Sequence, residues 1–256
     1  MSASAYYRQI SGVLAAIDQT QKTKLERAGE VLAEAMAGGN RAYLFGSGHS
    51  VIPVMDVFPR YGSFVGFFPL YDPRLMWHNV VGAGGARELL WLERHEGYIQ
   101  HFLQSFALAP GDCMIVFSHG GLNAAPIEAA LYAKGRGLKV VTVSSLANAV
   151  APATHSSGKR LSDVADIAID NCVPPEDALV DLGFPEKVSA GSTMAAVFVA
   201  MSLVAETGAR LAAKGIKPRT FVSPNVPGVG KNHNLGVFDA YTEALFSRSP
   251  VNYVNA

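Results

Sequence analysis

Apolar side chains recur at every third or fourth position between Tyr6 and Met36, and this spacing places them along one face of a helix. The run ends at Gly38-Gly39, where glycine can take the left-handed conformation that closes many helices. The pattern therefore predicts a long leading helix within residues 1–39, broken near Gln19-Thr20.

Five short runs that follow are almost continuously apolar, whereas a strand with one solvated face alternates between apolar and polar positions. Continuous runs are typical of strands that helices cover on both faces of a parallel sheet. Segments with helical spacing separate the runs, so strand and helix alternate and right-handed crossovers are expected. The predicted strands are residues 41–45, 63–68, 112–117, 138–143 and 166–170, and the helices between them are 51–60, 86–107 and 123–134.

The fold class that this order predicts is α/β, a three-layer α-β-α sandwich around a five-stranded parallel sheet. We predict one domain over residues 1–256, with the core sheet in 40–172 and C-terminal helices that complete the site and the interface in 173–256. After the last strand we expect a loop over 172–181, a helix over 186–214, an extended piece over 219–223 and a final helix over 235–246.

Composition and charge limit the classes of binding partner that we expect for this protein. Lys plus Arg and Asp plus Glu both total 21, so we expect neither nucleic acid nor an anionic membrane as a partner. The most apolar run, residues 194–205, is shorter than the roughly 20 residues of a membrane span and predicts a buried helix. Cys113 and Cys172 lie in apolar stretches that resemble strands, and the chain starts without a signal-peptide core; both features predict a reduced, cytoplasmic setting.

Polar chemistry collects in the loops after the predicted strands, where ligands bind in open parallel sheets. Gly46-Ser47-Gly48-His49-Ser50 follows the first strand and Ser118-His119-Gly120-Gly121-Leu122-Asn123 follows the third, and each opens a helix. Glycines let the backbone approach a ligand closely, while amides and hydroxyls donate to anion oxygens. These loops therefore predict a site for a phosphate or a sulfonate.

Two further polar segments can extend this site. The fourth strand ends at Ser144-Ser145, and residues 155–160 read His-Ser-Ser-Gly-Lys-Arg. Each of these polar segments also has a simpler interpretation when it is considered alone. Gly-Ser-Gly can be a tight turn in which the serine caps the following helix, and His155 and Lys159 can be solvated loop residues. Residues 82–85 suit either a mobile lid or a flexible connection.

Sequence motifs for cofactors and metals are missing. A dinucleotide fingerprint needs glycine where Val51 stands and an acidic residue after Phe68, and a P-loop needs Gly-Lys followed by Ser or Thr. No close histidine pair such as H-x-x-x-H occurs, so a metal could be held only by residues that the fold brings together. We therefore expect no cofactor and assign no metal ligand from the sequence.

Several of these segments together resemble the sugar isomerase (SIS) domain family, and more narrowly its bacterial single-domain members that begin with a leading helix. The resemblance implies a sheet in flavodoxin-like order, a phosphosugar at the first and third strand ends with Ser50 and Ser118 on its anionic group, and a homodimer or homotetramer. The matching segments are residues 46–50, 60–62, 93–94, 96–98, 118–128, 155–166, 192–193 and 222–225.

One departure from the family pattern bears on the ligand. Many SIS domains have a hydroxyl residue where this chain has Gly120, and often another where it has Asn123. Loss of a charge-assisted donor costs about 1.5 to 3 kcal/mol unless it is replaced. Either His119 and Asn123 substitute for it, or the ligand is a sulfonated or non-phosphorylated sugar. The predicted substrate-binding residues are Gly46, Ser47, Gly48, His49, Ser50, Arg60, Ser118, His119, Gly120, Asn123, Ser145, His155, Ser156, Ser157, Lys159 and Asn225.

An aldose-ketose isomerase needs a base to move a proton between adjacent carbons through an enediol, and an acid to open the ring. SIS enzymes commonly take a carboxylate from a helix and a histidine from the C-terminal region, which assigns Glu96 and His233, the histidine coming from the same chain or a neighbouring subunit. His49, Asp56 and Glu93 are further catalytic candidates, although Asp56 can instead pair with the arginine four positions on. The alternatives are a non-catalytic sugar-phosphate sensor and a lyase or etherase acting on an amino-sugar phosphate.

Overall fold

A five-stranded parallel sheet forms the centre of the computed structural model, which describes residues 2–76 and 85–247. Its order, β2-β1-β3-β4-β5, is the flavodoxin-like order that the resemblance implied. The direction of strand addition reverses at β1, and the carboxyl ends of β1 and β3 lie side by side where ligands bind in such sheets. The strands are β1 (Ala42–Gly46), β2 (Phe67–Pro69), β3 (Cys113–Phe117), β4 (Lys139–Ser144) and β5 (Ile167–Asp170).

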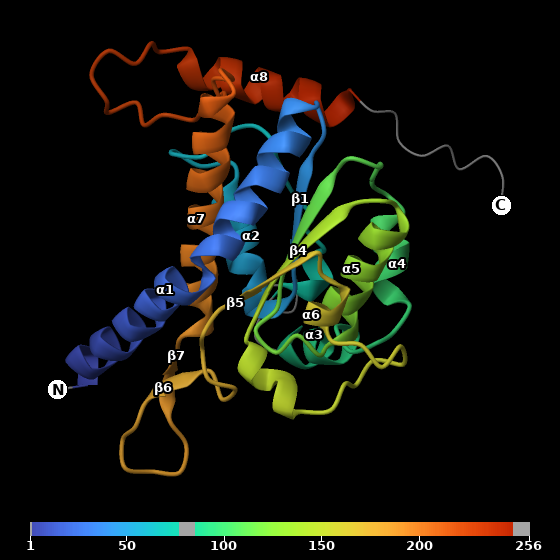
Figure 1. Cartoon of the computed structure of the whole chain (residues 1–256), viewed down its shortest axis with the longest axis vertical. Coiled ribbons are helices and arrows are strands. Elements are labelled where there is room, and N and C mark those ends of the chain that lie inside the picture. The colour runs from blue at the N-terminus through green and yellow to red at the C-terminus, as the bar shows by residue number, and fades with distance from the viewer. Residues whose placement is uncertain (1, 77–84, 248–256) are drawn as a thin grey trace.

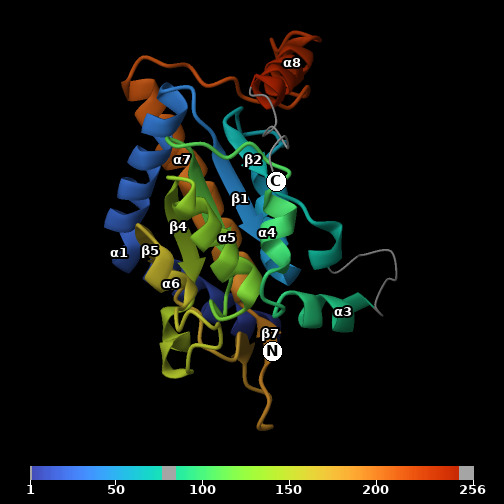
Figure 2. The ribbon, with the colours of Figure 1, turned by 90° about the vertical axis from the view of Figure 1, so that its right-hand side faces the viewer.

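Two layers of helices cover the sheet (Figures 1 and 2). In β1, Leu44 packs in the core of one layer and the next residue, Phe45, in the core of the other. Both faces of the sheet are therefore buried, which explains the continuous apolar runs and confirms the three-layer α/β sandwich. One layer contains α1 (Ser2–Ala37), α2 (Val51–Val57) and α7 (Ser192–Ala213), and the other α3 (Gly85–Leu92), α4 (Tyr98–Leu103), α5 (Ala124–Gly135) and α6 (Leu161–Val164).

The leading helix α1 is continuous, so the predicted break near Gln19 is wrong. Thr20 Oγ1 donates to Ala16 O at 2.7 Å within the helix. The Gln21 side chain is buried, and its Oε1 accepts from Asp170 N at 3.1 Å. The polar residues at this point thus anchor the helix to the end of β5 instead of interrupting it.

Three other predicted elements are shorter than expected. Helix α2 ends at Val57, because the next residue precedes a proline and takes an extended conformation. Strand β2 starts late, because residues 63–65 pair with the extended piece around Thr220. The helix expected over residues 86–107 is divided into α3 and α4, and Gly97 at φ 88° lies between them.

The chain between β5 and α7 differs most from expectation. A two-stranded hairpin, β6 (Ala178–Val180) with β7 (Val188–Ala190), replaces the predicted loop and helix start. Asp177, at φ 58°, accepts from Ser192 N at 2.7 Å and from Ser192 Oγ at 2.8 Å, so α7 begins only there. Cys172 follows β5 instead of lying in a strand, because its amide donates to the Asp170 carboxylate at 3.0 Å and turns the chain.

Helix α7 is the one helix in the described residues that is long and apolar enough to cross a membrane, with a mean hydropathy of 1.4. The core helices of globular proteins meet the same criterion. Here Val199 and Leu203 are buried in the core, and α7 packs against α1 (Figure 1). Packing within the chain therefore accounts for its apolar composition.

The last helix, α8 (His233–Phe246), crosses the amino-terminal end of the sheet, at the top of Figure 1. Arg41, which directly precedes β1, is buried and donates to the carbonyl oxygens of Ala244 and Leu245, the latter at 3.3 Å. Its guanidinium also lies 5.2 Å from the ring centre of Phe68. These contacts hold α8 at the end of the sheet opposite the carboxyl ends of the strands.

Candidate functional site

The loops after β1 and β3 form one hollow at the carboxyl edge of the sheet. The first loop closes tightly because Gly46 has no side chain: a Cβ there would lie 2.1 Å from the carbonyl oxygen of Ser50. Ser50 and Ser118 both line this first hollow, together with Thr193. Its volume is about 10 Å³, the space of about one water molecule. A phosphate group would therefore place only part of itself inside, with the remainder at the mouth.

Several hydroxyl groups can donate into the first hollow. Ser118 Oγ accepts from the Gly121 amide at 3.2 Å, which leaves its own proton available for a ligand oxygen. Thr193 adds a hydroxyl from the first turn of α7. The Ser192 amide is already bound by Asp177, so α7 contributes through the Thr193 hydroxyl rather than through that amide.

Asn171, Ser192 and Thr193 line the first hollow but are missing from the ligand-binding residues predicted from the sequence. Two signals could have found them. Ser192 and Thr193 follow a glycine at the start of a long apolar helix, and Asn171 follows a strand directly, as the residues of the two predicted loops do. The Asn171 amide lies 3.2 Å from His119 Nδ1 and so orients a residue that was predicted.

Glu93 joins the two loops. Its Oε2 accepts from Ser47 Oγ at 2.7 Å, and its Oε1 accepts from Asn123 Nδ2 at 2.8 Å. Glu93 is 7% exposed, and burial raises the pKa of its carboxyl, although the Ser47 hydrogen bond acts in the opposite direction. Ser47 does not cap its own helix through its side chain, so the simple turn-and-cap interpretation of Gly-Ser-Gly does not hold.

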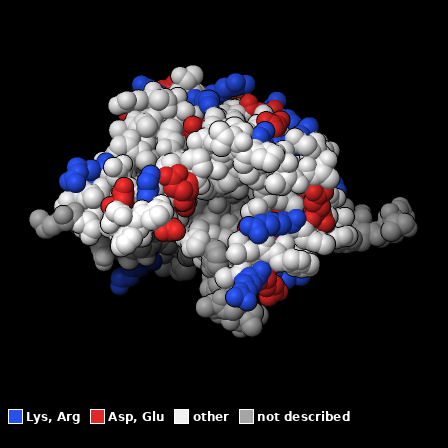
Figure 3. All heavy atoms as spheres, turned by 90° about the horizontal axis from the view of Figure 1, so that it is seen from below, with Lys and Arg blue, Asp and Glu red and all other residues white. Residues whose placement is uncertain are grey.

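The last residues of the loop after β3 line a second hollow of about 440 Å³, to which Arg94, Glu96 and His155 also contribute. Glu96 Oε1 accepts from Ser156 N at 2.7 Å, and its Oε2 accepts from Ser156 Oγ. These hydrogen bonds lower the pKa of the Glu96 carboxyl. Figure 3 views the molecule from the end that carries both hollows, where acidic and basic side chains are interspersed.

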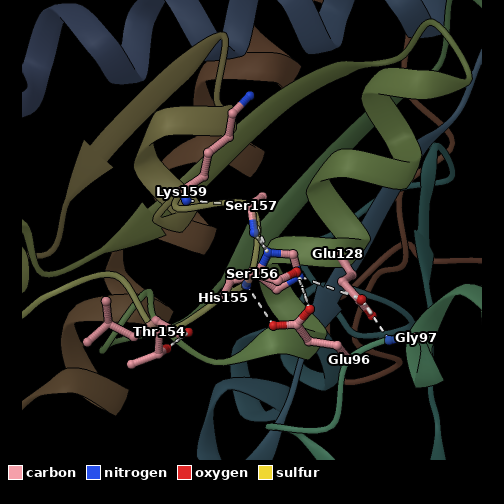
Figure 4. A network of polar contacts seen from close by, with 9 residues as sticks. Glu96, Gly97, Glu128, Thr154, His155, Ser156, Ser157 and Lys159 are labelled. Atoms are coloured by element: carbon pink, nitrogen blue, oxygen red, sulfur yellow. Dashed lines mark hydrogen bonds and ion pairs between the residues drawn. The ribbon is translucent and has the colours of Figure 1, made fainter.

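The His155 side chain is buried and not solvated. It is 6% exposed, and its Nε2 lies 3.6 Å from Glu128 Oε1 and 3.8 Å from Glu96 Oε2. Glu128, on α5, was not predicted as a site residue, and its Oε1 accepts from Gly97 N at 2.7 Å. Figure 4 shows the imidazole and both carboxylates facing one another, whereas the Lys159 amine points away.

Four residues predicted for the site lie away from both hollows. Asp56 pairs with Arg60, four positions on and beyond the end of α2, as the alternative interpretation of Asp56 expected. Asn225 is exposed in the segment before α8. His233 Nε2 lies 2.8 Å from Thr220 O, at the amino-terminal end of the sheet. A contribution of His233 to the site of a neighbouring subunit stays a prediction.

Ser145 and residues 82–85 were also predicted to belong to the site or to cover it. Ser145 is buried and donates to Val173 O at 2.6 Å, so it ties two loops together. Of the lid or connection predicted at residues 82–85, only Gly85 lies within the described residues.

A parallel sheet in this order, with glycine- and serine-rich loops after its first and third strands, is the arrangement that the resemblance to sugar isomerase domains implied. The family model described as SIS domain matches residues 5–145. A UPF0309 protein of Caldanaerobacter subterraneus is 34% identical over 245 residues, which cover 94% of this chain and 97% of that protein. Another, from Streptomyces coelicolor, is 34% identical over 244 residues, covering 91% and 95%. The chain belongs to the SIS domain family and, within it, to the UPF0309 proteins.

Solved structures share this fold at low sequence identity. The phosphoheptose isomerase from Francisella tularensis has a TM-score of 0.53 and 12% identity over 81% of this chain and 96% of that chain. The phosphoheptose isomerase from Neisseria gonorrhoeae has a TM-score of 0.50 and 11% identity over 81% and 97%. This likeness establishes the fold.

Proposed function

We propose that this protein binds a phosphosugar at the carboxyl edge of its sheet and interconverts the aldose and ketose forms through an enediol. The observation that carries the proposal is the position of Ser50 and Ser118, which come from separate loops and line one hollow. Their hydroxyl protons suit the oxygens of a phosphate or a sulfonate. The larger second hollow, which begins at the end of the same loop, has room for the sugar.

Glu93 is the carboxylate best suited to act as the base. A general base works best when its pKa lies near the working pH; burial raises the pKa of Glu93, whereas Ser156 lowers that of Glu96. Each oxygen of Glu93 accepts one hydrogen bond and retains a second lone pair for a proton. Glu93 reaches the second hollow through its partner Asn123, which lines it, and we assign the proton transfer to Glu93 in place of Glu96, which lines that hollow directly.

A thermal-shift screen over phosphosugars, sulfonated sugars and neutral sugars tests the binding part of the proposal. A ligand at 100 times its Kd adds about 2.7 kcal/mol of stability. We expect anionic sugars to raise the Tm and the matched neutral sugars to leave it unchanged. Stabilisation by neutral sugars alone would exclude the anion site.

Proton exchange at the sugar C1 or C2 in deuterated water tests the chemistry with the ligand found by the screen. An isomerase exchanges this proton, a sensor does not, and an etherase eliminates a substituent. We expect Glu93→Gln to abolish exchange and to retain binding, because the amide keeps the size of the carboxyl but cannot take the proton. Unchanged exchange in Glu93→Gln would remove Glu93 from the mechanism.

A non-catalytic sugar-phosphate sensor is the second candidate. One observation favours it: Glu93 is 7% exposed and both its oxygens are already engaged, an arrangement that also suits a purely structural carboxylate. The same experiment separates the two functions, because a sensor binds the ligand without exchanging its protons.

A further inference from the structure

Three residues from different parts of the chain converge beside the second hollow. Glu96 lies between α3 and α4, Glu128 lies on α5, and His155 lies in the loop before α6. One oxygen from each carboxylate and one imidazole nitrogen all lie within 4.8 Å of one another. Figure 4 shows the three side chains directed at a common point.

Two of these side chains carry buried polar atoms whose hydrogen bonding is incomplete. Glu128 Oε2 and His155 Nε2 are shielded from solvent without a hydrogen-bond partner in the described part of the chain, and the side chains are 5% and 6% exposed. A buried polar atom without a partner is unfavourable, so a ligand that occupies the site would relieve this cost. The 3.6 and 3.8 Å from Nε2 to the carboxylates are too long for hydrogen bonds.

The same separations suit ligands of one metal ion. Two donors about 2.1 Å from a tetrahedral metal lie roughly 3.4 Å apart. We propose that Glu96, Glu128 and His155 bind one divalent transition metal ion, Zn²⁺ or Mn²⁺. One imidazole with two carboxylates and no thiolate is a donor set that both ions accept.

Neighbouring groups already orient the three ligands. Gly97 N fixes Glu128 Oε1, and Ser156 fixes both oxygens of Glu96. The Ser157 amide donates to His155 Nδ1 at 3.1 Å, and Ser157 Oγ lies 2.7 Å from the same nitrogen. Metal binding at Nε2 moves the ring proton to Nδ1, where Ser157 Oγ can accept it in place of the amide contact. Such outer hydrogen bonds commonly set the tautomer and direction of metal ligands.

Three protein ligands leave a fourth position open. Because Glu96 and His155 line the second hollow, that position faces it and is accessible to water or to an oxygen of a bound molecule. The proposal is independent of the phosphosugar, because it concerns the binding of a metal ion to the protein alone.

Titration calorimetry with the tag-free full chain, stripped with a chelator and dialysed, tests the site with ZnCl₂ and MnCl₂ in separate runs. We expect one ion per chain for at least one metal, confirmed by elemental analysis after desalting. His155→Gln and Glu128→Gln should weaken binding at least about tenfold. The matched controls His101→Gln and Glu176→Gln, both at exposed positions, should bind as the wild type does.

Glu96→Gln keeps the test decisive if a buried substitution prevents folding, because the Glu96 side chain is 39% exposed. Circular dichroism establishes folding before each titration. Absence of a one-to-one ion in the wild type, or wild-type affinity in folded Glu96→Gln and His155→Gln, would overturn the proposal. Failure of the sugar screen would leave the metal stoichiometry unchanged, so the two proposals fail separately.

Discussion

Ser47 Oγ donates to Glu93 Oε2 at 2.7 Å, and this hydrogen bond joins the loop after β1 to the end of α3. Asn123 binds the other oxygen, so a single buried carboxylate sets the relative position of both glycine-rich loops. The Glu93 carbonyl oxygen also accepts from Ala125 N at 2.9 Å, in the first turn of α5. Movement of Glu93 would therefore disturb the loops that line both hollows.

Stability should depend on pH through Glu93. Burial raises its folded pKa above the ordinary value of 4.5, so at neutral pH the buried charge lowers stability. As pH falls through the raised pKa towards 4.5, the folded state takes up the proton before the unfolded state does, and stability increases. Glu93→Gln removes this contribution, so we expect the Tm difference between wild type and Glu93→Gln to change over that interval and to level off below it. Parallel Tm curves for the two proteins would contradict the assignment; Glu34→Gln, at an exposed position, serves as control.

Gly120→Ser should tighten anion binding. A Cβ at Gly120 would meet nothing within 4 Å, so a serine fits and restores the hydroxyl that many SIS domains have there. One added hydrogen bond to a charged group, about 1.4 kcal/mol, lowers the Kd for a phosphosugar about tenfold. Gly120→Ala is the matched control, because it adds the same Cβ without the hydroxyl. Equal affinity in Gly120→Ser and Gly120→Ala would show that the anion lies elsewhere.

Removing both predicted anion contacts should have the opposite effect. Ser50→Ala with Ser118→Ala is expected to raise the Kd for the anionic sugar at least about tenfold, since two donors are lost. Calorimetry at fixed ionic strength measures this, and Ser11→Ala on α1 controls for loss of a serine elsewhere. Wild-type affinity in the double variant would show that the first hollow does not bind the anion.

The sheet could be predicted from the sequence because each strand is indicated by its own run of consecutive apolar residues. The central strands β1 and β3 are buried at every position, so their runs are continuously apolar, and Leu44 and Phe45 illustrate how adjacent residues pack into opposite layers. The position of Ser50 beside Ser118 follows from strand order, because both residues come after the ends of neighbouring parallel strands.

Contacts between distant segments could not be predicted in the same way. Glu128 lies among alanines and an isoleucine on α5, and only the packing of the loop around His155 against that helix reveals its partner. Glu93 was recognised as a candidate, but its hydrogen bonds to both loops depend on where the chain turns after α3. His233 was assigned by resemblance, and no local pattern indicates that α8 is held at the opposite end.

Arg41 should control the docking of α8. Its buried guanidinium donates to Tyr43 OH at 3.2 Å as well as to carbonyl oxygens at the end of α8. Arg41→Ala removes these charge-assisted hydrogen bonds, and we expect a loss of about 1.5 to 3 kcal/mol of stability. Limited proteolysis should cut residues 216–247 faster, whereas the control Arg8→Ala, at an exposed position, should behave as the wild type does. Unchanged Tm and cleavage would show that other contacts hold α8.

His233 should not affect anion binding within its own chain. It lies at the amino-terminal end of the sheet, and glutamine can still donate to Thr220 O, so His233→Gln should fold and bind the anionic sugar as the wild type does. If His233 completes the site of a neighbouring subunit, His233→Gln loses proton exchange, as Glu93→Gln does. Randomly mixed subunits of these two inactive variants in a dimer then regain about a quarter of wild-type activity, because half of the dimers contain one intact site. Mixed dimers that assemble and stay inactive would show that His233 does not act across the interface.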